Sequence, residues 1–265
     1  MFKIFRRLWQ VNWAEQWQYR ANLIMYLLYW LVSPIIYLAV WTSIAQSKGS
    51  VNGLTPNDFV TYYMTLLVVD QITSNIVIHT FAYKVQDGSL SGELVRPIHP
   101  MLTNALVNNI AFKALTILGF IPVWIVLFFL YKPDFSSVTF SGILLALPAM
   151  MMGFFVGFLL SAAITSLAFW TTRVYSIHEF YYALMLLFSG QFVPLTLMPK
   201  FIQDVAQYLP FQLLIYYPIQ LILGRLSSAQ IVQGYVTGII WLVAAIVVFN
   251  WVWRNGVKRY SAVGA

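Results

Sequence analysis

The stretch "ALTILGFIPVWIVLFFL", residues 114–130, decides the fold of this sequence. It runs for seventeen residues without one charged side chain. A helix needs about 20 mostly apolar residues to cross the hydrocarbon core of a bilayer. Lipid offers no hydrogen-bonding partner to an open backbone, so a helix is the expected spanning form. With its flanks, the stretch predicts a membrane-spanning helix over about residues 104–131.

The composition of the whole chain points to the same solvent. Of its 265 residues 60% are hydrophobic and only 9% are charged, whereas a soluble domain carries about 25% charged residues. Aromatic residues make up 17%, and amphipathic rings favour the headgroup level of a membrane. The chain has no cysteine, which excludes a disulfide framework, a thiolate metal site and a cysteine nucleophile.

Five other stretches have a similar apolar character and length. We therefore predict an all-α, polytopic membrane protein with six transmembrane helices, forming a single transmembrane domain over residues 1–265. The six predicted spans cover about residues 22–46, 59–83, 104–131, 140–169, 179–198 and 231–253.

The N-terminal residues 1–21 mix basic and aromatic side chains. Arg6 and Arg7 lie among tryptophans and large apolar residues. This pattern favours a helix that lies in the membrane surface, with its basic residues toward anionic headgroups. The alternative is that these residues are simply the solvated start of the first span.

A further apolar segment, residues 211–224, is short and is interrupted by Pro218. Counting it as a seventh span would place the basic C-terminal residues outside the cell, against the usual excess of cytoplasmic Lys and Arg. With six spans, four basic residues lie outside: Lys48, Lys132, Lys200 and Arg225. The cytoplasmic side then holds Lys3, Arg6, Arg7, Arg20, Lys84, Arg96, Arg173, Arg254, Lys258 and Arg259.

This distribution has three consequences. We predict that residues 199–230 form an outer re-entrant segment between the fifth and sixth helices. We expect a multi-pass protein of the plasma (bacterial inner) membrane with cytoplasmic N- and C-termini. The basic residues behind the net charge of +7 gather on the cytoplasmic side, so we expect the lipid bilayer, and no nucleic acid, as their partner.

The cytoplasmic loop over residues 84–100 is unusually structured for a connection. Gly88 suits the left-handed residue that ends a helix, and Leu90 and Leu94 supply an apolar face to a short following helix. The Arg96–Pro97 pair ends that helix, since the residue before proline disfavours helical geometry. Such an element offers a docking surface for a soluble partner. The alternative is an elaborate connection between two helices.

The whole pattern resembles a permease of the ABC type-2 exporter family. The resemblance rests on the basic N-terminal helix, the six spans, the broken outer segment and the glycine–leucine–arginine–proline pattern of the loop. It implies a dimer with a second copy or a related permease, coupled to separate ABC ATPase subunits that hold the ATP and magnesium. By this resemblance residues 87–97 are a coupling helix, residues 2–20 are an interface helix, and the ATPase-contacting residues are Asp87, Gly88, Leu90, Glu93, Leu94, Arg96, Pro97, Arg6 and Arg7.

Catalytic and cofactor motifs are absent from the sequence. There is no G-x-x-x-x-G-K-[ST] phosphate-binding loop and no H-E-x-x-H zinc motif. The three histidines are scattered along the chain without a second ligand at helical spacing. We therefore expect no catalytic residues, no metal site and no cofactor in this chain, and expect that it is not an enzyme.

Polar residues in the predicted second span are candidates for lining a pathway. A charged side chain at membrane depth costs about 2.5–3.5 kcal/mol, so Asp70 should face protein or a water-filled cavity. Helical spacing places Asn75 and His79 on a nearby face. The alternative is a structural hydrogen bond to another helix. Asp70 also supports a second reading of the function, an ATP-independent secondary transporter or channel, and a membrane enzyme acting on lipid is a weaker third.

Small residues recur every four positions on two predicted spans. They are Gly153, Gly157, Ser161 and Thr165 on the fourth span and Gly234 and Gly238 on the sixth. Such faces let helices approach closely. They predict packing within the chain or, alternatively, a dimer face.

Overall fold

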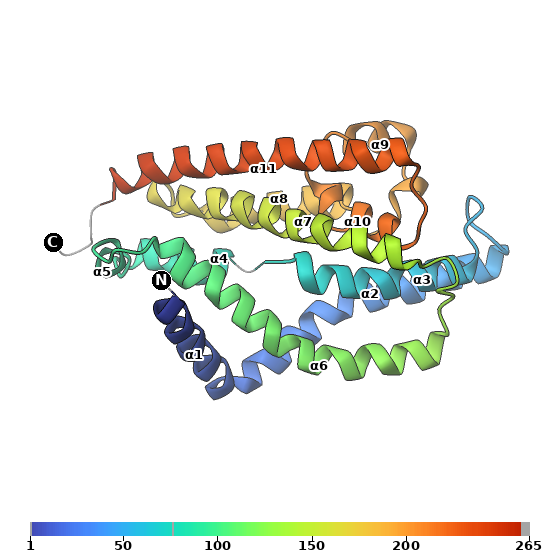
Figure 1. Cartoon of the computed structure of the whole chain (residues 1–265), viewed down its shortest axis with the longest axis horizontal. Helices are drawn as coiled ribbons and strands as arrows, with labels where there is room; N and C mark the ends of the chain where they lie inside the picture. The colour runs from blue at the N-terminus through green and yellow to red at the C-terminus, as the bar shows by residue number, and fades with distance from the viewer. Residues whose placement is uncertain (1, 76, 261–265) are drawn as a thin grey trace.

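The computed structural model describes residues 2–75 and 77–260, which are almost entirely helical (Figure 1). Within these ranges there are eleven α-helices and no β-strand, so the predicted all-α fold is confirmed. A π-helical turn at Met101–Leu106 precedes α6. The α-helices are α1 (Phe2–Gln18), α2 (Arg20–Lys48), α3 (Pro56–Thr73), α4 (Val77–Gln86), α5 (Ser91–Leu94), α6 (Val107–Tyr131), α7 (Phe140–Ser166), α8 (Val174–Phe188), α9 (Lys200–Ala206), α10 (Tyr216–Ile222) and α11 (Ser228–Val257).

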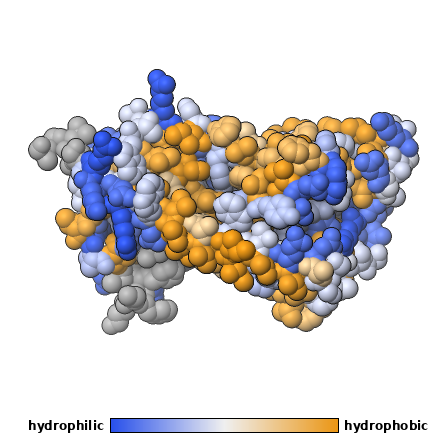
Figure 2. Space-filling view, turned by 90° about the horizontal axis from the view of Figure 1, so that it is seen from above, coloured by the Kyte–Doolittle hydropathy of each residue, from blue (hydrophilic) through white to orange (hydrophobic). Residues whose placement is uncertain are grey.

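Four helical stretches are long and apolar enough to cross a membrane. They are Ala21–Lys48, Val107–Tyr131, Phe140–Phe169 and Ser228–Val257. They coincide with the predicted first, third, fourth and sixth spans. Figure 2 shows a broad apolar band across the middle of one face of the molecule, with hydrophilic residues gathered toward its ends. This is the surface expected of a protein whose waist lies in lipid.

The predicted second span is broken, which corrects the expectation of one continuous helix over residues 59–83. Its helix ends at Thr73, Ser74 is extended (φ −62°, ψ 162°), and α4 begins at Val77. Neither glycine nor proline causes this break. Side chains such as Ser74 and Asn75 hydrogen-bond to nearby backbone and so compete with helix formation.

The predicted fifth span is shorter than expected. Its helix, α8, has 15 residues and ends at Phe188. Gly190 follows with φ +83°, a conformation that glycine adopts without steric cost. The chain then continues irregularly toward α9. Of the six predicted spans, four are therefore full-length helices in the described structure, the second is broken and the fifth is short.

The helix α7 lies at the centre of the packing, against α11, α10, α3 and α4. Glycines make these approaches possible. A Cβ added at Gly153 would collide with the backbone of Leu213, and one added at Gly234 would collide with the Tyr217 ring. The small-residue faces predicted from the sequence are thus used for packing within the chain.

The segment over residues 199–230 folds into short pieces. It contains α9, a 3-10 turn at Phe211–Leu213 and α10, which has only seven residues. Leu213, Ile215 and Ile219 are buried in the main hydrophobic core. In Figure 1 α9 and α10 lie at the end of the molecule opposite the two termini.

The same end carries an ion pair that ties this segment to α3. Thr55 and Asp58 form a capping box at the start of α3, and Arg225 donates a hydrogen bond to the Asp58 carboxylate. Partial burial raises the pKa of Asp58, but hydrogen bonds from Thr55 and Arg225 outweigh it and hold the pKa below its usual value. The carboxylate therefore favours its charged, paired state.

Candidate functional site

The loop between α4 and α6 lies at the same end of the molecule as both termini (Figure 1). Its first turn is held by Asp87, whose carboxylate accepts hydrogen bonds from Ser89 N at 2.9 Å and Ser89 Oγ at 2.7 Å. These bonds hold the pKa of Asp87 below its usual value. Gly88 adopts φ +81°, as its predicted role as a helix-ending residue requires.

Two contacts anchor the loop to α4. Lys84 Nζ lies 2.7 Å from Glu93 Oε1, and Leu90 N donates to the Lys84 carbonyl at 3.0 Å. The Leu90 side chain is 0% exposed and belongs to the hydrophobic cluster that contains Phe81 and Met101. The loop is therefore a fixed element of the fold.

The exposed tip of the loop follows α5. Val95 is 85% exposed, and Arg96 and Pro97 beside it are also exposed. The tip of the loop is therefore accessible from outside the molecule, with an apolar side chain next to a charged one.

The predicted ATPase-contacting residues of the loop thus separate into three groups. Asp87, Arg96 and Pro97 are exposed, while Gly88, Glu93 and Leu94 are half-buried. Leu90 was expected to belong to the docking face, and the structure corrects this. Its side chain is buried and holds the loop, so it offers no surface to a partner in this conformation.

The N-terminal helix α1 carries the two other predicted contact residues, Arg6 and Arg7, and both are exposed. Near its end Gln16 Nε2 donates to Asn108 Oδ1 at 3.0 Å, which fixes α1 against α6. In Figure 1 α1 leaves the bundle at a steep angle. The basic residues of α1 and the loop tip therefore belong to the same end of the molecule.

His99 connects the loop to the last helix. Its ring centroid lies 4.5 Å from that of Trp253 and 5.9 Å from that of Phe249. Burial lowers the pKa of His99 below its usual value, because the apolar surroundings disfavour the charged ring. The neutral ring therefore acts as a packing contact between the loop and α11.

A second candidate site is a cavity of about 180 Å³ that contains the predicted pathway residues Asp70 and Asn75. The side chain of His79, the third predicted residue, lies outside the described residues. Because α3 ends at Thr73 and Ser74 is extended, helical spacing is not what brings Asp70 and Asn75 together. The cavity is lined by Tyr26, Tyr29, Trp30, Ser33, Asp70, Thr73, Ser74, Asn75, Ile78, His178, Glu179, Tyr181, Tyr182, Met185, Gln191, Leu214 and Ile215.

In three polar side chains of this cavity, an oxygen lacks a hydrogen-bonding partner among the described residues. Asp70 is 8% exposed, and no described residue forms a hydrogen bond or a close ion pair with its carboxylate. Gln191 Oε1 and the Tyr181 hydroxyl are buried without a hydrogen-bonding partner among the described residues. Buried polar groups normally have partners, so these acceptors mark a place where water or a ligand is needed.

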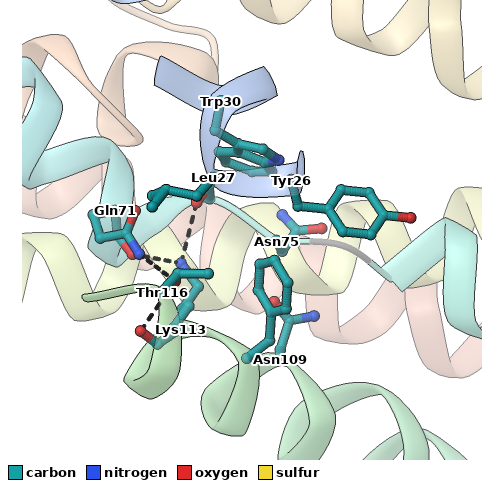
Figure 3. A pocket seen from close by; sticks show the side chains of 10 residues that line it. Tyr26, Leu27, Trp30, Gln71, Asn75, Asn109, Lys113 and Thr116 are labelled. Carbon is teal, nitrogen blue, oxygen red and sulfur yellow. Dashed lines mark hydrogen bonds between the residues drawn. The ribbon is translucent and has the colours of Figure 1, made fainter. Parts of the chain in front are cut away.

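The break behind this cavity is held by Lys113 of α6 (Figure 3). Its Nζ donates to the carbonyls of Gln71 at 3.0 Å and Ile72 at 2.9 Å, and to Ser74 Oγ at 3.2 Å. A cation is favourable at a helix C-terminus, where backbone carbonyls lack partners. Lys113 thus caps α3 from another helix.

The roles of Lys113, Gln191 and Tyr181 were not among the predictions from the sequence. A lysine just inside an apolar span is nevertheless a signal of a specific partner. Gln191 and Tyr181 carried no comparable signal, because a glutamine and a tyrosine near the end of an apolar span are also expected at the membrane interface.

Among residues 2–75 and 77–260, no three His, Cys, Asp or Glu side chains come together as metal ligands. No curated protein matches the chain. Residues 22–264 match the family described as ABC-2 family transporter protein. The match covers most of the sequence, so the chain belongs to this family and is a membrane permease component of an ABC transporter.

Proposed function

We propose that this ABC-2 family permease is the membrane subunit of an ATP-driven exporter, coupled to separate ATPase subunits through residues 84–100. In this proposal six segments cross the plasma membrane, the broken and short helices included, and both termini are cytoplasmic. Residues 199–230 then form the re-entrant outer segment. ATP and magnesium are bound by the ATPase partner.

The observation that carries this proposal is the combination of a fixed loop with an exposed tip. A connection that only joined two helices would need neither the Lys84–Glu93 ion pair nor a buried Leu90. Force from a partner can be transmitted through a rigid element but is dissipated in a mobile one. The exposed Val95 and Arg96 supply an apolar and a charged contact at the tip.

The cavity supports a dimeric arrangement. It lies between α2, the end of α3 and α8, and its wall includes exposed side chains such as Tyr29 and Glu179. A second permease copy, or a related permease, would enclose this side and complete a pathway. A closed pathway is needed because polar groups such as Asp70 are costly against lipid.

The test is affinity purification of the tagged chain from its own membranes in mild detergent, with mass spectrometry of the proteins that accompany it. We expect a stoichiometric ATPase subunit. The double variant Val95→Asp/Arg96→Ala should lose it. Phe201→Asp, which places the same charge at an exposed apolar residue of α9, is the matched control and should retain it.

Two outcomes would contradict the proposal. The wild-type chain could purify without an ATPase subunit, or the loop variant could retain the subunit as fully as the α9 control. A separate variant, Glu93→Gln, removes the ion pair to Lys84. It should keep the partner but lower transport per ATP hydrolysed.

A second function, an ATP-independent transporter or channel, is favoured by one observation, the buried and unpartnered carboxylate of Asp70. It predicts solute transport by the purified chain in liposomes without any partner, abolished in Asp70→Asn. Absence of such transport, together with a co-purified ATPase, would eliminate it.

A further inference from the structure

We propose that the cavity beside Asp70 binds an organic cation with an aromatic or apolar body, which is the substrate class of the permease. The ligand's role as a substrate rests on the proposed function. Its binding does not, and can be measured on the purified chain alone.

The charge of the lining is the first argument. Asp70 and Glu179 contribute two carboxylates, and Tyr182 lies within electrostatic range of both. Among the described lining residues there is no Lys or Arg, and His178 is the one basic side chain. A buried carboxylate is stabilised by an opposite charge, so the cavity is electrostatically suited to a cation.

The nearby cation of the chain does not fill this role. Lys113 acts on Asp70 through the electrostatic field, but its ammonium group already donates to Gln71 O, Ile72 O and Ser74 Oγ. An ammonium group has three hydrogens to donate, and all three are used at the helix break. The Asp70 carboxylate therefore remains available on the cavity side.

The walls of the cavity are aromatic. Five rings line it, those of Tyr26, Tyr29, Trp30, Tyr181 and Tyr182. Aromatic faces attract cations, and several such rings around one site are the usual means of recognising a quaternary or alkylated ammonium group.

An independent polar group also points into the site. Gln191 is 6% exposed, and its Oε1 accepts no hydrogen bond from a described residue. The backbone on both sides of it is held, since Tyr62 donates to the Gly190 carbonyl at 2.7 Å and Tyr63 to the Phe192 carbonyl at 2.7 Å. The unpaired oxygen of Gln191 is thus a fixed acceptor that requires a donor or a positive charge.

The size and composition of the cavity favour an organic ion over a metal. Its volume of about 180 Å³ is several times the roughly 30 Å³ that one water occupies. A bare metal ion would need several oxygen or nitrogen ligands at close range, and no three His, Cys, Asp or Glu side chains of the described residues come together in that way. A bulky cation buries its apolar body against the rings and places its charge at Asp70.

The experiment uses two probes of nearly equal size and opposite charge, trimethylphenylphosphonium and phenyltrifluoroborate, each with a single phenyl ring and small enough for a cavity of about 180 Å³. Binding of each to the purified full-length chain in detergent is measured by equilibrium dialysis, with empty micelles as the blank. We expect saturable binding of the phosphonium and none of the borate. Equal binding of both probes would overturn the proposal.

Variants locate the site. Asp70→Asn keeps the shape and removes the charge, and should weaken phosphonium binding about tenfold or more, as expected for loss of a unit-charge interaction at an effective dielectric constant near 20. Asp204→Asn removes an exposed carboxylate of α9 and is the matched control, expected to bind as wild type. Unchanged binding in Asp70→Asn would also overturn the proposal.

If Asp70→Asn does not fold, Ser33→Lys replaces it as the test. This half-buried cavity residue would place a cation beside the carboxylates, and it should abolish phosphonium binding, whereas retained binding would refute the site. The two proposals fail separately. If an ATPase co-purifies but binding does not depend on charge, the proposed permease function stands and the cation site is refuted. If binding depends on Asp70 but no ATPase co-purifies, the cation site stands and the proposed permease function is refuted.

Discussion

Replacing Lys113 by methionine should open the break between α3 and α4. The variant keeps a side chain of similar length but removes hydrogen bonds to Gln71 O, Ile72 O and Ser74 Oγ, at 3.0, 2.9 and 3.2 Å. A hydrogen bond to a charged group contributes about 1.5–3 kcal/mol. The three are not additive, and water can reach the carbonyls once the lysine is gone. We therefore expect a loss of about 3–5 kcal/mol in the free energy of unfolding, in the range of breaking a buried charged interaction.

The assay is denaturant unfolding in detergent, with hydrogen exchange of residues 70–78 as a local measure. The matched control is Lys200→Met, which removes an exposed lysine paired with Asp204 at 2.9 Å and should change little, as surface ion pairs do. In Lys113→Met, exchange should quicken around the break before the rest of α3 unfolds. If the two variants have the same stability, or if exchange at residues 70–78 is unchanged, the capping role of Lys113 is refuted.

Three further predictions concern packing and pH. Gly234→Ala forces a methyl group into a tyrosine ring and should lower stability by about 1–3 kcal/mol, measured as the unfolding midpoint, whereas Gly92→Ala, which faces open space, should not. The pKa of Asp58 in the folded protein lies below its ordinary value of 3.8, so the pairing with Arg225 stabilises the folded state above that pH. This stabilisation is lost as the pH falls through the folded pKa. Asp58→Asn should therefore reduce the drop in the unfolding midpoint between about pH 5 and pH 3. Because the folded pKa of His99 lies below 6.5, the folded state is favoured above that pH and loses stability as the pH falls toward the folded value. The midpoint should decrease from about pH 7.5 to 5.5, and less so in His99→Phe; an identical decrease would contradict the packing role.

The long helices could be predicted from the sequence because their signal is local. A run such as residues 114–130 excludes water along its whole length, whatever it packs against, and α6 includes all of it. The turn at Gly88 was equally readable, since a residue with φ +81° favours glycine for steric reasons. Composition and backbone sterics are therefore sufficient to predict the long helices and this turn.

The break at Ser74 and Asn75 was not predictable in the same way. Polar residues such as Ser74 and Asn75 weaken a helix but also occur within helices, and the group that satisfies the freed carbonyls comes from Lys113, far along the chain. The same holds for Leu90, whose position beside charged residues suggested an exposed face, while its burial depends on Phe81 of α4. Both outcomes depend on contacts between segments that hydrophobic patterning alone does not specify.

The cavity extends this argument, because its walls come from α2, the end of α3, α8 and the outer segment. Asp70 could be singled out since a carboxylate in an apolar span needs an explanation. Gln191 could not, because nothing in the sequence distinguishes a buried, unpartnered glutamine from one at the membrane surface. A functional site made of ordinary residue types becomes recognisable only when their missing partners are counted.

The break also gives the proposed permease a mechanical connection between its two sites. With ten residues, α4 is about 15 Å long and carries the loop at one end through Leu90 and the Lys84–Glu93 ion pair. Its other end begins beside Asn75 at the cavity wall. Under the proposed function, we expect an element held rigidly at the loop and interrupted at the cavity to move as a unit about the interruption, as hinge motions do. Because α3 is held at its far end by the Asp58–Arg225 pair, a push on the loop would then act at the cavity wall and change the surroundings of Asp70.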